Sequence, residues 1–131
     1  MQYKKLSPCI ITDKLKECKD FYLKHFNAKL TFDCGWYINL YLENENTEFQ
    51  FMEPQAPQHV VCNPAGLTYN LMVTDVDKVH EELTNAGITA LEPLENHPWG
   101  DRGFAIQDPA GIILYIYTEI EPNEEFKKYY I

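Results

Sequence analysis

Two parts of the chain repeat the same order of apolar and polar positions, 62 residues apart. In each part a short apolar run ends at an aspartate, Asp13 in the first and Asp75 in the second. Aspartate is a frequent N-cap because its side chain accepts hydrogen bonds from free backbone amides. After each aspartate the apolar residues recur every three or four positions, which is the spacing of one helical face. The pattern predicts a strand followed by an amphipathic helix in both halves.

Strand-like runs follow each predicted helix. We expect strands at 29–33, 36–42 and 48–52 in the first half, and at 88–91, 103–107 and 113–118 in the second. The order strand, helix and three strands therefore occurs twice, which predicts an α+β protein built from two βαβββ modules.

The chain of 131 residues is expected to form a single domain, 1–131. Its expected parts are module one at 1–53, a proline-containing linker at 54–66, module two at 67–121 and a C-terminal tail at 122–131. In the tail, Phe126, Tyr129 and Tyr130 are spaced as one face of a short helix.

The stretch 98–111 contains the most specific local pattern. Its last four residues, Asp-Pro-Ala-Gly, form a turn signal, because proline presets one dihedral angle and Gly111 tolerates a positive φ. The stretch predicts a β-hairpin with Trp99 in the loop at its open end. Arg102 in the same loop is expected to hold the loop through Asp101 or Asp108, or to pair with an acidic group of a ligand.

Several motifs in order resemble the glyoxalase/bleomycin-resistance/dioxygenase (vicinal oxygen chelate) superfamily. They are W-G-x-R at 99–102 with D-P-x-G at 108–111, the Asp-Phe-Tyr of the first helix at 20–22, and Asp-Val-Asp at 75–77. The hairpin is similar to that of the bleomycin-resistance branch, although Ile112 stands where drug-binding members usually have Asn. The resemblance implies the vicinal oxygen chelate fold, a curved mixed-sheet cup with helices outside.

The resemblance also implies where metal ligands would lie. Metal enzymes of the superfamily place His and Glu ligands on the cup face, and hard or borderline divalent ions need such donors. The matching positions here are Leu6, Gln50, Thr68 and Tyr115, none of which supplies an imidazole or a carboxylate. We therefore expect no metal and no cofactor. His97 has no partner at ligand spacing, and no metal role is assigned to it.

Strand alternation divides the predicted sheets into two faces. The helix-facing set is apolar and consists of Ile38, Leu40, Phe49, Phe51, Leu71, Leu114 and Ile116. The cup face mixes tyrosines with amides and a hydroxyl, as ligand pockets do, and it also includes Leu6 and Met52. The candidate ligand-binding residues, loop tryptophans included, are Trp99, Tyr37, Asn39, Tyr41, Gln50, Thr68, Asn70, Tyr115, Tyr117 and Trp36. The alternative is that the tyrosines only fill the concave side.

The net charge of −9 argues against nucleic acid and anionic membranes as partners, and it serves either solubility or the attraction of a cationic ligand. No apolar run approaches the length of a membrane span, and the first residues do not form a signal peptide, so a cytoplasmic location is expected. The four cysteines are scattered without a C-x-x-C pair, which indicates reduced thiols.

The leading hypothesis is a metal-free small-molecule-binding protein, similar to bleomycin-resistance proteins, that sequesters a cationic planar ligand or antibiotic. The resemblance implies a homodimer. The alternatives are a glyoxalase- or dioxygenase-like enzyme, either metal-dependent or assisted by Tyr115 or Tyr37 as acid or base, and a scaffold or regulatory dimer without a cavity.

Overall fold

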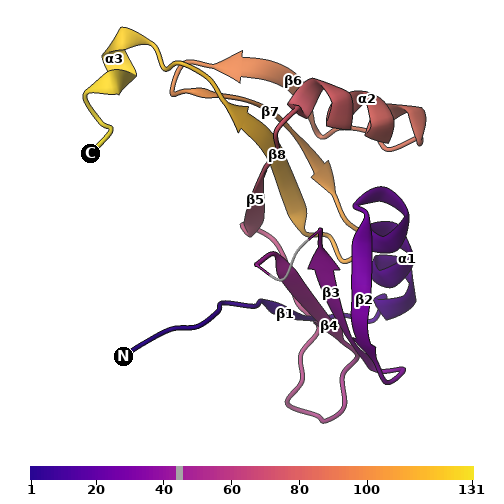
Figure 1. Cartoon of the computed structure of the whole chain (residues 1–131). Helices are drawn as coiled ribbons and strands as arrows, with labels where there is room; N and C mark the ends of the chain where they lie inside the picture. Colours follow the sequence, from indigo (N-terminus) through magenta and orange to yellow (C-terminus); the bar gives the residue numbers. More distant parts are fainter. Residues whose placement is uncertain (44–45) are drawn as a thin grey trace. The chain divides into compact units, whose positions relative to one another are not determined.

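The computed structural model describes residues 1–43 and 46–131 (Figure 1). The chain forms two compact units. The first unit contains residues 1–63 and 108–111, and the second contains residues 64–107 and 112–131. The division after residue 63 falls inside the expected linker, while the expected single domain and its bounds stay a prediction.

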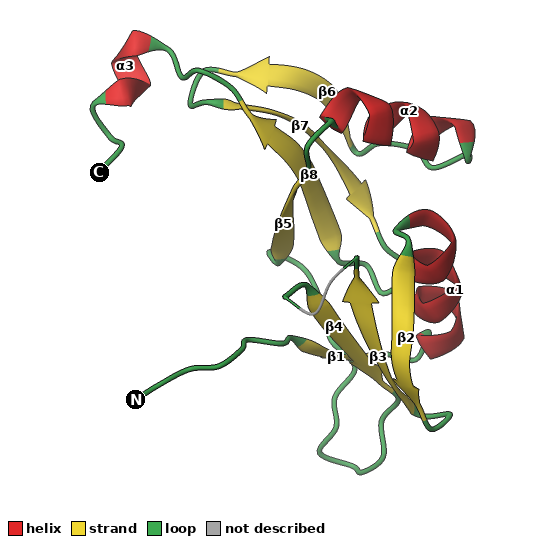
Figure 2. Ribbon diagram, viewed as in Figure 1, coloured by secondary structure: helices red, strands yellow, loops and turns green. Residues whose placement is uncertain are grey.

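The first unit contains one helix and a four-stranded mixed sheet (Figure 2). Its elements are β1 (Cys9–Ile11), α1 (Leu15–His25), β2 (Ala28–Asp33), β3 (Tyr37–Leu42) and β4 (Glu48–Met52). The strands lie in the order β1-β4-β3-β2, and β1 pairs in parallel with β4 while the other pairs are antiparallel.

The second unit repeats this plan. Its elements are β5 (Thr68–Met72), α2 (Val76–Asn85), β6 (Glu92–His97), β7 (Asp101–Gln107), β8 (Ile113–Glu119) and the short α3 (Glu124–Lys127). The strand order is β5-β8-β7-β6, again with one parallel pair, β5 with β8. The prediction of two βαβββ modules in an α+β protein is confirmed.

The two longer helices, α1 and α2, each cover one face of their own sheet. Helix α1 packs against β2, β3 and β4, and α2 packs against β7 and β8. Six of the seven residues expected on the helix-facing side are buried, and Leu71 is half-buried. Strand β3 alternates strictly between half-buried and buried positions along its length. The apolar faces predicted from the alternation are therefore the cores of the two units.

A buried polar contact ties α1 to the Asp-Pro-Ala-Gly turn within the first unit. The Tyr22 hydroxyl donates to Asp108 Oδ2 at 2.6 Å, and both residues are buried. Gly111 adopts φ +88° and its amide donates to the Asp108 carbonyl at 3.0 Å, as the turn signal predicts. Loss of this hydrogen bond is expected to lower the free energy of unfolding, because water cannot replace the lost partner of a buried polar group.

The two helices differ in how they begin. Asp75 caps α2, and its Oδ1 accepts the amide of Lys78 at 3.0 Å, as predicted. Asp13 does not cap α1, so the corresponding prediction is wrong. The N-cap of α1 is Lys14, whose side chain makes no capping hydrogen bond, and the buried Thr12 accepts the Lys14 amide on its Oγ1 at 3.0 Å.

The first strand after α2 was also misplaced by its sequence pattern. The strand predicted at 88–91 is wrong, since β6 covers Glu92–His97. It is a polar edge strand with Pro93 and a register shift between Glu92 and Glu95, so it carries no apolar alternation. Edge strands tolerate proline and charge because one side of their backbone needs no ladder partner.

Two smaller expectations concern the chain ends. Leu6, expected on the cup face, precedes β1 and is 89% exposed. In the tail, α3 is confined to Glu124–Lys127, so Phe126 lies in it while Tyr129 and Tyr130 follow it. None of the helices in residues 1–43 and 46–131 is long and apolar enough to cross a membrane.

The unequal caps give a paired test. We expect Asp75→Ala to lower the free energy of unfolding by about 1 kcal/mol, because α2 loses its only observed side-chain cap. Asp13→Ala, at an exposed residue outside any cap, is expected to stay within about 0.5 kcal/mol of wild type. Urea unfolding of both variants checks this, and equal losses would contradict the assignment.

Candidate functional site

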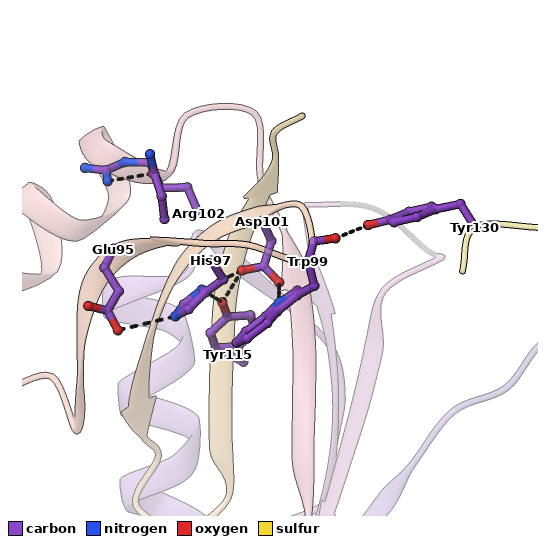
Figure 3. A network of polar contacts seen from close by, with 8 residues as sticks. Glu95, His97, Trp99, Asp101, Arg102, Tyr115 and Tyr130 are labelled. Atoms are coloured by element: carbon purple, nitrogen blue, oxygen red, sulfur yellow. Dashed lines mark hydrogen bonds and ion pairs between the residues drawn. The ribbon is translucent and has the colours of Figure 1, made fainter. Parts of the chain in front are cut away.

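The second unit gathers polar and aromatic side chains at the β6–β7 hairpin (Figure 3). We call Glu95, His97, Trp99, Asp101 and Tyr115 the His97 cluster. Strand β6 ends at His97 and β7 begins at Asp101, and these two residues are paired across the hairpin. The tight turn between them contains Gly100 at φ +114°, a backbone conformation that favours glycine.

The Asp101 carboxylate is the centre of the cluster. Its Oδ1 accepts the Tyr115 hydroxyl at 2.6 Å, and its Oδ2 accepts the Trp99 indole N–H at 2.6 Å. His97 Nδ1 lies 2.8 Å from the same Oδ1 and 3.1 Å from the Tyr115 oxygen. Because a carboxylate only accepts, the Nδ1 atom carries the proton in this contact. On the other side of the ring, Nε2 lies 3.4 Å from Glu95 Oε1.

The aromatic rings of the cluster are stacked. His97 and Trp99 lie parallel, with ring centroids 4.5 Å apart and an interplanar angle of 4°. Tyr115 stacks on Tyr117 at 5.7 Å and 16°. Trp99 nevertheless remains 47% exposed. Its backbone carbonyl accepts the Tyr130 hydroxyl, so ring and backbone of this tryptophan are both fixed. The result is a large aromatic surface that is rigid and open to solvent.

Tyr115 is a donor in this arrangement. Burial, the hydrogen bond to Asp101 and the negative charge of Asp101 raise the pKa of its phenol well above the ordinary value of 10.0. The neighbouring β7 residue makes room for this phenol, because a Cβ on Gly103 would lie 2.6 Å from the Tyr115 oxygen and 2.8 Å from the Ile116 carbonyl. The phenol therefore depends on a position without a side chain.

The first unit has its own polar face, opposite α1. Register places Tyr37 beside Met52, Asn39 beside Gln50, and Tyr41 beside Glu48. Trp36 precedes β3 and its ring centroid lies 6.1 Å from that of Tyr37. This face also holds a buried carboxylate, Glu48.

The ten candidate ligand-binding residues divide between the units. The first unit contains Trp36, Tyr37, Asn39, Tyr41 and Gln50, and the second contains Thr68, Asn70, Trp99, Tyr115 and Tyr117. Within the second unit the structure joins Trp99 and Tyr115 through Asp101, and register sets Asn70 beside Tyr115 and Thr68 beside Ile113. A ligand-binding role for these ten residues stays a prediction.

Sequence reasoning missed the roles of His97 and Asp101. Arg102 was expected to hold the loop through Asp101 or Asp108, or to pair with an acidic group of a ligand. Its guanidinium contacts the Asp77 carboxylate at 2.7 and 3.0 Å and Asn96 Oδ1 at 3.0 Å, so the first expectation is wrong and the second stays a prediction. Arg102 and Asp101 are neighbours in a strand, so their side chains point to opposite faces of the sheet. The missed signal was the spacing of His97 and Asp101 around a glycine turn, which is visible only once β6 is placed correctly.

The residues at the family's ligand positions do not fit a metal ion. Leu6 offers no donor, and Gln50, Thr68 and Tyr115 offer only an amide, a hydroxyl and a protonated phenol. Among residues 1–43 and 46–131, no group of three or more His, Cys, Asp or Glu side chains is arranged to hold a metal ion.

Fold and sequence identify the family. The sequence model of the Glyoxalase/Bleomycin resistance protein/Dioxygenase superfamily matches residues 6–116, so the chain belongs to this superfamily. An uncharacterised protein of Mycobacterium bovis is 32% identical over 117 residues, which cover 81% of this chain and 77% of the relative.

Solved structures share the vicinal oxygen chelate fold. A superfamily member from Nocardioides has a TM-score of 0.76 at 16% identity, covering 92% of this chain and 86% of its own. TnmS3, an antibiotic-binding protein from Streptomyces, has a TM-score of 0.73 at 20% identity, with coverage of 90% and 97%. A lactoylglutathione lyase from Agrobacterium tumefaciens has a TM-score of 0.72 at 17% identity, with coverage of 89% and 94%. One fold thus serves binding and catalysis, and at these identities the likeness concerns the fold alone.

The raised pKa of Tyr115 predicts alkaline behaviour. The folded phenol stays protonated above pH 10.0, where the phenol of an unfolded chain ionises, so its stabilising contribution is present below that pH and is lost as pH rises toward the folded value. We expect the free energy of unfolding to fall less steeply above pH 10 in Tyr115→Phe than in wild type. Tyrosinate absorbance of the folded variant should also lack one late-titrating group.

Tyr3→Phe is the matched control, since Tyr3 is 84% exposed. It should leave the late-titrating group in place. The assignment fails if Tyr115→Phe removes an ordinary tyrosine from the titration instead.

Proposed function

We propose that the protein binds a small, planar, cationic organic molecule at the His97 cluster and sequesters it without a metal. The observation that carries this proposal is Trp99, a half-exposed indole fixed by Asp101 on its edge and by His97 on one face. The Trp99 side chain is already held in one conformation. When a flat ligand stacks on it, little binding free energy is therefore lost to ordering this side chain.

Charge supports a cationic ligand. Asp101 and Glu95 place carboxylates next to the stacked rings, and aromatic faces attract cations directly. The net charge of −9 adds long-range attraction for a positive molecule, and this attraction weakens as salt is added. Antibiotic binding by TnmS3, which has the same fold, is consistent with the proposal.

Acid–base catalysis is a second candidate, and one observation favours it. His97 Nδ1 and the Tyr115 hydroxyl both contact Asp101 Oδ1, which is an arrangement that can hold an imidazole in one tautomer beside a phenol donor. The lactoylglutathione lyase shows that the fold can carry an enzyme. Sequestration and catalysis differ in the fate of the ligand, which is recovered unchanged only in the first case.

The proposal includes the homodimer and the cytoplasmic location expected above. Neither is needed for the stacking argument, which rests on residues of one unit.

The test uses proflavine as a planar aromatic cation and acridine-9-carboxylate as an anion of similar shape. We expect saturable quenching of tryptophan fluorescence by proflavine and a rise in melting temperature at saturation. Trp99→Ala should weaken binding by about 5- to 150-fold, because stacking on an aromatic side chain is worth about 1–3 kcal/mol. Acridine-9-carboxylate should bind more weakly than proflavine.

Trp36→Ala is the matched control, since Trp36 is 43% exposed and lies in the first unit. Equal losses from the two tryptophan variants would contradict binding at the His97 cluster. Mass spectrometry of the recovered ligand separates sequestration from conversion.

A further inference from the structure

A lysine from outside the sheet occupies the polar face of the first unit. Lys5 lies in the N-terminal segment before β1, and its Nζ donates to Glu48 Oε2. The same Nζ lies 4.7 Å from the centroid of the Tyr41 ring. Tyr41 and Glu48 are paired across β3 and β4, so the ammonium contacts two adjacent side chains of one face.

The receiving carboxylate belongs to the sheet and is buried. Glu48 is only 6% exposed, and its Oε1 accepts a hydrogen bond from the side-chain Nε2 of Gln50 at 2.7 Å. Burial acts to raise the pKa of Glu48, but hydrogen bonds from Lys5, Gln50 and Ser7 and the charge of Lys5 together lower it to about 2. The group is therefore a carboxylate at neutral pH, and a carboxylate with so little access to water needs a cation beside it.

The same face presents a further acceptor. Asn39, beside Gln50 in the register, has a buried Oδ1 that finds no hydrogen-bond partner within residues 1–43 and 46–131, while its Nδ2 donates to Thr31 at 2.7 Å. Buried acceptors without a donor are rare in proteins. An oxygen-lined face of this kind fits a compact group with several N–H donors.

Residues 1–6, the part of the chain that carries Lys5, are exposed. Met1, Tyr3 and Leu6 are 103%, 84% and 89% exposed. The backbone of the segment pairs with the sheet at Pro8, whose carbonyl accepts the backbone N–H of Gln50 at 2.9 Å. The side chains of Met1, Tyr3 and Leu6 are thus free to leave without disturbing the core, while Ser7 adds a hydrogen bond to Glu48 beside that of Lys5.

We propose that Glu48, Gln50 and Tyr41 form a binding site for a primary aliphatic ammonium group, and that Lys5 fills this site in cis until an amine ligand displaces it. The site shares no residue with the His97 cluster and does not rest on the function proposed there. A primary ammonium is the class favoured because the site already holds one, over an aromatic face and against a buried carboxylate. Lys5 acts as a tethered competitor at an effective concentration on the order of millimolar.

The experiment titrates the full-length protein with n-butylammonium chloride, following the backbone amides of β3 and β4 by NMR. Lys5→Ala removes the competitor and should bind n-butylammonium about tenfold or more tightly than wild type. Lys4→Ala, which removes the neighbouring charge, should bind as wild type does. Adding Glu48→Gln to Lys5→Ala should abolish saturable binding.

The absence of saturable binding to Lys5→Ala, or equal affinity in Lys5→Ala and Lys4→Ala, would overturn the proposal. If Lys5→Ala does not fold, acylation of the wild-type protein decides. Lys5 should react more slowly than Lys4 with an amine-directed reagent, and n-butylammonium should accelerate its reaction. Equal rates at the two lysines would refute occupancy of the site, and a Lys5 rate that n-butylammonium leaves unchanged would refute displacement.

Discussion

Each four-stranded sheet of this protein has two faces and one long helix to cover them. Helices α1 and α2 can bury only one side each, so most of the buried apolar residues of the strands lie on that side. The pleat then sends every other residue to the opposite face, whatever its chemistry. The strand residues Tyr41, Glu48 and Gln50 of one candidate site, and Tyr115 of the other, occupy their positions because of this packing requirement.

The same requirement explains what the sequence could predict. Strands β3, β4 and β8 carry apolar residues at every second position, so their existence, their extent and their buried faces follow from the pattern. Helix α2 has both a periodic face and a cap, and it too was placed correctly. In all these elements a local signal and the demand for burial agree.

The remainder depended on contacts between distant residues. Strand β6 has no apolar periodicity because it is an edge strand, and its position is set by pairing with β7. Because the sequence pattern misplaced β6, it revealed neither the pairing of His97 with Asp101 nor the contact between Arg102 and Asp77. Asp13 carried the same N-cap signal as Asp75, but α1 begins one residue later, with Lys14 as its N-cap.

The two units therefore share a plan but satisfy their carboxylates differently. In the second unit, Asp101 accepts hydrogen bonds from the uncharged phenol and indole groups of Tyr115 and Trp99. In the first unit, Glu48 is balanced by the full charge of Lys5. The two repeats of the fold thus carry carboxylates with different partners, uncharged groups in one and a lysine in the other.

Gly103 shows how a site can depend on a residue that has no Cβ atom. A side chain there would meet both the Tyr115 oxygen and the backbone carbonyl of Ile116, and a carbonyl within a strand cannot move aside. In a laboratory evolution experiment, position 103 would therefore tolerate few residues other than glycine. Substitutions would displace the Tyr115 phenol without altering any charged residue of the cluster, and a search confined to reactive side chains would overlook Gly103.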